Sequence, residues 1–110
     1  MAIYSNFSID QGSTFSSIVT VEGQDGLAFN LTGYTPRGQI RKTYSSSTAV
    51  NFSASIASAV SGQISLSLTA TQTGNLKPGR YVYDVEIVNG DVVVRVVEGQ
   101  VEVNPRVTRV

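Results

Sequence analysis

The 110-residue chain contains no cysteine, no histidine and no tryptophan. Without cysteine or histidine it has no disulfide framework, no zinc site of the usual ligands and no cysteine or Ser-His-Asp nucleophile. Eight basic and eight acidic side chains cancel to a net charge of zero, which argues against a nucleic-acid binder that relies on bulk positive charge. We therefore expect a protein that is not an enzyme, has no cofactor or metal and has no nucleic-acid partner.

Long apolar runs are missing as well. No stretch of the chain approaches the roughly 18 apolar residues that a membrane-spanning helix needs. The first 25 residues carry neither the basic segment nor the unbroken apolar run of a secretory signal peptide. We expect no membrane partner.

Charge is also absent from one long segment. None of the sixteen charged side chains falls within residues 43–76, although the chain as a whole is neutral. Burying such a segment against a partner requires no desolvation of charged groups. The sequence therefore points to residues 43–76 as the place to look for a partner.

The residues that are abundant favour β-structure. Val, Ile and Thr make up 33 of the 110 residues, whereas Leu, Glu and Lys make up only 11. β-branched side chains lose rotamer freedom in a helix but pack well on a pleated sheet. Composition therefore predicts an all-β fold.

Alternation of apolar and polar residues divides the chain into seven or eight short strands. Apolar residues at 50, 52, 54 and 56 alternate with polar ones, and the same pattern recurs over residues 64–69 and 81–87. Asn89-Gly90 predicts a tight hairpin. The pattern predicts an immunoglobulin-like antiparallel β-sandwich in a single domain, residues 1–104, followed by a C-terminal tail, residues 105–110.

Two local features refine this prediction. Thr69 and Gln72 have the spacing of a capping box, so we expect one or two helical turns over residues 69–76, the only helix. Apolar parity slips between residues 92 and 103, which indicates a β-bulge at Gly99 or, alternatively, a strand buried on both faces. Tyr81 or Tyr83 is placed to hydrogen-bond back across the corner after the helix, as in other immunoglobulin-like domains.

Candidate chemical groups lie on predicted outward faces. Asp84 and Glu86 share a strand face about 7 Å apart, a spacing that suits either paired carboxylates for glycoside hydrolysis or two calcium ligands. A solvated or arginine-paired outer face explains them better. Arg37, Arg41 and Lys42, joined by Arg80 or Arg95, form a basic stripe that suits a phosphate or sugar contact. A solvated face or a protein contact explains it better. Three tyrosines are candidates for stacking on sugars or anchoring an interface, namely Tyr4, Tyr34 and Tyr44.

Several segments resemble a bacteriophage protein family. Residues 25–34, DGLAFNLTGY, resemble the segment that opens the N-terminal immunoglobulin-like domain of phage baseplate upper proteins. Residues 62–85 are similar to that family's G-x-I-x-L-x-L-T-x-x-x-T-x-x-L-x-x-G-x-Y-x-Y-D-V run, and residues 98–109 to its EG-x-V-x-V…VTR ending. The motifs consist of turn and core residues, so they report fold and lineage better than activity.

The resemblance implies a non-enzymatic structural or assembly protein of a phage virion, in the tail, baseplate or neck. Such a protein is made in the host cytoplasm, forms a homo-oligomer and contacts other virion proteins. The alternative is a carbohydrate-binding or host-adhesion module of the same fold, with a glycan as its partner. The expected contact surface consists of exposed strand edges and rim side chains, represented by Tyr4, Arg37, Arg41, Tyr44, Arg106 and Arg109.

Overall fold

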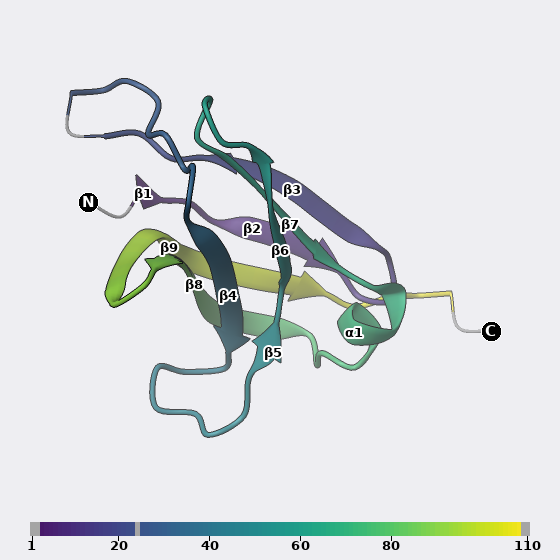
Figure 1. Ribbon diagram of the computed structural model, residues 1–110. Helices are drawn as coiled ribbons and strands as arrows, with labels where there is room; N and C mark the ends of the chain where they lie inside the picture. The colour runs from purple at the N-terminus through teal and green to yellow at the C-terminus, as the bar shows by residue number, and fades with distance from the viewer. Residues whose placement is uncertain (1–2, 24, 109–110) are drawn as a thin grey trace.

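The computed structural model describes residues 3–23 and 25–108, which form a β-sandwich with one short helix (Figure 1). The elements are β1 (Ile3–Tyr4), β2 (Phe7–Asp10), β3 (Phe15–Thr20), β4 (Thr35–Arg41), β5 (Val50–Asn51), β6 (Ser53–Ser58), β7 (Gln63–Leu68), α1 (Ala70–Gly74), β8 (Gly79–Asn89) and β9 (Val92–Asn104). β9 ends at Asn104, where the tail is expected to begin. The predicted immunoglobulin-like all-β fold is confirmed.

Two sheets pack face to face. The large sheet has the strand order β1-β9-β8-β4-β5, with β2 also paired to β9, and the small sheet has the order β3-β7-β6. The two N-terminal strands run parallel to β9, whereas every other described strand pair is antiparallel. The described chain contains nine strands rather than seven or eight, because the N-terminal strand is interrupted at residues 5–6 and β5 is separated from β6 at Phe52.

The core lies between the sheets and follows the predicted alternation. Tyr83, Val85 and Ile87 of β8 point inward, while Asp84 and Glu86 point outward. β7 alternates in the same way, with Ile64, Leu66 and Leu68 fully buried and with polar residues between them. The fully buried side chains come from both sheets, so each sheet covers the apolar face of the other.

The predicted bulge exists, but not at Gly99. The β8–β9 register shifts between Val85, which pairs with Val97, and Glu86, which pairs with Arg95. Val96 is the extra residue, and both Val96 and Val97 are 1% exposed. The bulge turns two neighbouring valines into the core, which explains the slip in parity.

Gly99 has another role. Between β1 and β2 the chain continues alongside β9 in the same parallel register, and the Ser5 N–H donates to the Glu98 carbonyl oxygen at 2.8 Å. The Asn6 side-chain oxygen accepts from the Gln100 N–H at 2.9 Å. A Cβ at position 99 would lie only 1.9 Å from the Ser5 carbonyl oxygen. Glycine is therefore required for the N-terminal strand to approach β9.

The corner between the sheets is built as predicted. Thr69 caps α1 in a reciprocal capping box with Gln72, although the helix is shorter than expected. The Tyr81 hydroxyl donates to the Lys77 carbonyl oxygen at 2.7 Å, which identifies Tyr81 as the corner tyrosine. Within the described residues, no helix has the length and apolar character needed to cross a membrane.

Candidate functional site

The outward face of the large sheet contains a hollow of about 750 Å³. One row of register partners crosses this face of the sheet from strand to strand, consisting of Tyr4, Glu98, Asp84, Gln39 and Asn51. Directly paired residues point to the same face of a sheet. Residues that are far apart in the sequence therefore form one continuous polar surface.

Ion pairs neutralise most of this surface. Arg37 Nε lies 2.9 Å from Glu86 Oε1, and these residues are direct register partners on β4 and β8. Arg95 Nε lies 3.3 Å from Asp84 Oδ2, and its Nη1 lies 3.8 Å from Glu98 Oε1. Asp84 and Glu86 thus belong to the arginine-paired outer face favoured by the sequence. Within the described chain, no group of three or more Asp or Glu side chains gathers where it could hold a metal ion.

Asp84 is the carboxylate at the centre of these pairs. Burial raises the pKa of Asp84 above its ordinary value, Arg95 partly offsets this, and the neighbouring carboxylates Glu86 and Glu98 add to the increase. The carboxylate is therefore held by Arg95 in surroundings that otherwise favour its protonated form.

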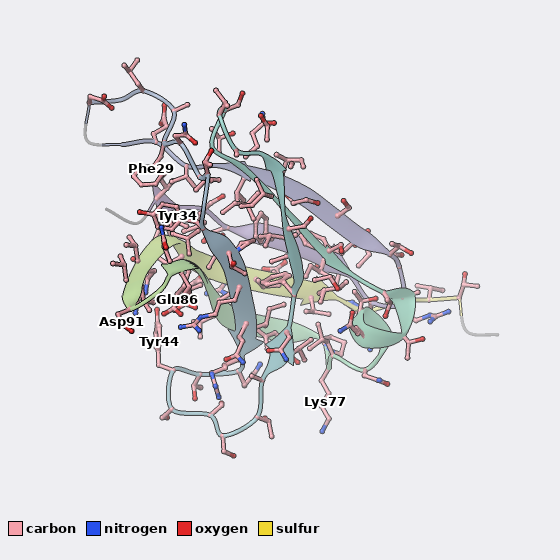
Figure 2. All side chains as sticks on the ribbon, viewed as in Figure 1. Phe29, Tyr34, Tyr44, Lys77, Glu86 and Asp91 are labelled. Atoms are coloured by element: carbon pink, nitrogen blue, oxygen red, sulfur yellow. The ribbon has the colours of Figure 1, made fainter. Side chains whose placement is uncertain are left out.

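The loop after β4 forms one wall of the hollow. Arg41 Nη1 donates to the Ser46 carbonyl oxygen at 2.6 Å, and its Nη2 donates to Gln39 Oε1 at 3.1 Å. Gln39 in turn donates to Asn51 Oδ1 at 2.8 Å. This network holds the loop that carries Tyr44, whose side chain extends beside the sheet face on the side of Glu86 (Figure 2). Tyr44 is 81% exposed, so its ring is available to a ligand.

The structure brings together four of the six predicted contact residues. Tyr4, Arg37, Arg41 and Tyr44 belong to the outward face of the large sheet or to its rim. Arg106 does not join them: its backbone N–H donates to Gln11 Oε1 at 3.2 Å, at the β2–β3 turn. Arg109 lies outside the described residues.

The predicted basic stripe is only partly correct. Lys42 follows the last residue of β4, and its Nζ lies 4.7 Å from the centroid of the Tyr81 ring rather than beside Arg37 and Arg41. Arg95 joins the face instead. Tyr34 is not among the residues that line the hollow, and its ring packs edge-on against Phe29, with ring centroids 5.7 Å apart.

The small sheet presents a second, different surface. Its three strands contain no charged residue. Most of its outward side chains are small and polar, and Ile18 is the large apolar exception at 52% exposure. The outward residues, on alternating positions of the three strands, are Ser16, Ile18, Thr20, Ser53, Ser55, Ala57, Gln63, Ser65 and Ser67.

The uncharged segment 43–76 supplies β6 and β7 of this sheet, but the sequence did not point to β3 as their neighbour. The available signal was Ile18, which breaks the alternation of its strand. Its exposure places a large apolar side chain on a face that otherwise consists mostly of small polar side chains.

The two edges of the small sheet differ. β6 has a register irregularity between Ile56 and Ser58, and just before it the Phe52 N–H donates to the Gly38 carbonyl oxygen of the large sheet at 3.0 Å. In the described chain, β3 pairs only with β7, and it runs along the margin of the molecule in Figure 1. β3 has no charge, no proline and no bulge, the features that usually protect an edge strand.

Comparison with known proteins supports the fold alone. No family model matches the chain, and no curated protein matches it in sequence. Among solved structures, it is similar to Listeria monocytogenes InlP, with a TM-score of 0.51 and 14% identity over 94% of this chain and 28% of that chain. A family 123 glycoside hydrolase from Clostridium perfringens has a TM-score of 0.42 and 14% identity, over 94% of this chain and 23% of that chain. The chain thus spans less than a third of either protein, and the similarity to InlP indicates a shared β-sandwich architecture.

Proposed function

We propose that this chain is a non-enzymatic structural or assembly module of a bacteriophage virion that acts through protein–protein contacts and self-associates. The phage part of the proposal rests on the resemblance of residues 25–34, 62–85 and 98–109 to baseplate upper proteins. The proposed protein–protein contact rests on the small sheet, whose three strands contain no charged residue.

The uncharged small sheet is the observation that carries the proposal. Burying charged groups costs several kcal/mol for each ion unless they are well paired, and the cores of protein interfaces are depleted of charged residues. The small sheet presents hydroxyl, amide and aliphatic groups only. The large sheet instead presents charged groups that already pair with one another. Burying the outward face of the small sheet against a partner therefore costs less free energy than burying the outward face of the large sheet.

Light scattering after size-exclusion chromatography tests this proposal. We expect a mass that is a multiple of the 11.7 kDa chain. Ser16→Glu, which places a charge on β3 of the small sheet, reduces that mass, whereas Ser47→Glu, in the exposed loop after β4, leaves it unchanged. A wild-type chain that stays at 11.7 kDa at high concentration would overturn the proposal.

The hollow on the large sheet favours glycan binding as a second candidate function. Planar polar side chains line it, and the exposed Tyr44 ring stands at its rim. Amphipathic aromatic rings combined with a few oriented polar groups are typical of ligand sites. On a glycan array, this function predicts a signal that Tyr44→Ala removes and that Val60→Ala, at another exposed position, preserves. An array without signal contradicts it.

A further inference from the structure

The free edge of β3 exposes a defined set of backbone groups. The Val21 N–H donates to the Gly62 carbonyl oxygen at 2.7 Å, in continuation of the β3–β7 register. Hydrogen-bonded and non-hydrogen-bonded pairs alternate along an antiparallel ladder. The odd-numbered residues of β3 therefore direct their backbone groups to β7, and the even-numbered residues direct theirs to the free edge. Those residues are Ser16, Ile18 and Thr20.

We propose that β3 pairs antiparallel with β3 of a second copy of this chain, about a two-fold axis at Ile18. This inference rests on the self-association proposed above and specifies the strand, the partner and the register. It joins two small sheets into one continuous sheet across the dimer, in which the free backbone groups of each β3 are satisfied by those of the other.

Two conditions fix the register. Directly opposed residues must point to the same side of the joined sheet, so a two-fold axis must pass through a residue rather than between two residues. Centring it on Ile18 pairs Ser16 with Thr20 of the second copy and Ile18 with its own counterpart. The second condition is that every edge-facing residue within β3 is hydrogen-bonded, and this register meets it. The two exposed isoleucine side chains also come into contact. Centring the axis on Ser17 leaves Thr20 without a partner inside β3.

The structure favours a second copy as the occupant of this edge. A two-fold interface brings each residue close to its own counterpart, so any charged residue near the axis would meet a like charge. β3 contains no charged residue, and neither does β7 beside it. The other edge of the small sheet is irregular and turns toward β4 at Phe52. The edge of β3 is thus the regular, unprotected edge of this sheet. It can pair with an identical β3 edge without bringing like charges together.

Single cysteine variants test the register, because the natural chain has no cysteine. In a hydrogen-bonded antiparallel pair the Cα atoms lie about 5.5 Å apart, within the range that a disulfide bridges. Ile18→Cys is therefore expected to form a disulfide-linked dimer under mild oxidation. The matched control Ser16→Cys does not form one, because the two copies of position 16 would lie about 14 Å apart.

An axis at Ser17 predicts a different result. The two copies of position 18 would then lie about 8 Å apart, beyond disulfide reach, and a mixture of the Ser16→Cys and Ile18→Cys proteins would cross-link instead. That result would overturn the proposed register. Failure of Ile18→Cys to cross-link in a protein that is oligomeric by mass would overturn the inference and leave the proposed self-association standing.

A charge at the edge provides the second test. Ile18→Lys removes no bond to β7 and is expected to shift the wild-type dimer to monomer. Val60→Lys, at another exposed apolar position, leaves the dimer intact. If Ile18→Lys has the mass of the wild type, the interface lies elsewhere and the inference is wrong. If the wild type itself is monomeric at every concentration, the proposed self-association fails together with the inference.

Discussion

At the residue scale, Tyr83 and Gly99 determine where the N-terminal strand lies. They are register partners on β8 and β9. The Tyr83 hydroxyl donates to the Ser5 carbonyl oxygen, and its ring lies 4.8 Å from the ring centroid of Phe7 and 5.9 Å from that of Phe52. Burial raises the pKa of Tyr83 to about 12. One aromatic side chain on β8 therefore contacts β2 and the junction between β5 and β6, and a residue without a side chain leaves the space for Ser5.

Tyr83→Ala is expected to lower the free energy of unfolding by about 3–5 kcal/mol, because it empties a buried aromatic site and removes the hydrogen bond to Ser5. Ser53→Ala, on the exposed face of β6, is expected to change it by less than about 0.5 kcal/mol. Urea denaturation of both variants measures the difference. Equal shifts would mean that the assignment of inward and outward residues is wrong.

Gly99→Ala is expected to destabilise the protein, because the added methyl group would overlap the Ser5 carbonyl oxygen and force β1 away from β9. Gly74→Ala is the matched control. Its nearest neighbour is 3.8 Å from the added Cβ and it lies in α1, so the substitution is expected to be neutral or to stabilise by up to about 1 kcal/mol. Thermal unfolding compares the two variants. A Gly99→Ala protein as stable as the Gly74→Ala protein would contradict the proposed close approach.

At the scale of elements, alternation could be predicted from the sequence and strand partners could not. The inward positions of β6, β7 and β8, the Thr69 capping box and the Asn89-Gly90 hairpin all depend on residues close together in the sequence, and each was predicted correctly. The parallel pairing of β1 and β2 with β9 joins residues more than 90 positions apart. The bulge at Val96 depends on which valines the core accommodates. No local pattern contains that information.

The paired charges on the large sheet predict a pH dependence. The raised pKa of Asp84 means that the folded state binds its proton more tightly than the unfolded state. The contribution of this group to the free energy of unfolding is therefore greatest at low pH, and it decreases as the pH rises through the ordinary pKa of about 3.8 toward the higher folded value.

Asp84→Asn removes this titration. Denaturant unfolding of both proteins at several pH values between roughly 3 and 6 measures it. The free energy of unfolding of the wild type, minus that of Asp84→Asn, is expected to fall as the pH rises. A difference that rises with pH would mean that Arg95 dominates and that the pKa of Asp84 is lowered.

At the scale of the whole molecule, a net charge of zero conceals two unlike faces. Opposite charges meet in pairs on the outward face of the large sheet, whereas the small sheet carries no charge. The sequence predicted four residues of the charged face and the uncharged segment that supplies β6 and β7. The open edge of β3 could not be predicted, because a strand becomes an edge only through the order of all the strands in its sheet. Ile18 breaks the apolar–polar alternation of its strand, but this break can be interpreted only once the order of strands in the small sheet is known.

Amide hydrogen exchange in β3, followed by NMR at increasing protein concentration, tests the central claim most directly. The amides of Ser17 and Val19 bond to β7 and are expected to be protected at every concentration. The amides of Ser16, Ile18 and Thr20 face the open edge. If this chain self-associates through the edge of the small sheet at β3, their protection rises with concentration. Rapid exchange of these amides at every concentration would contradict the claim.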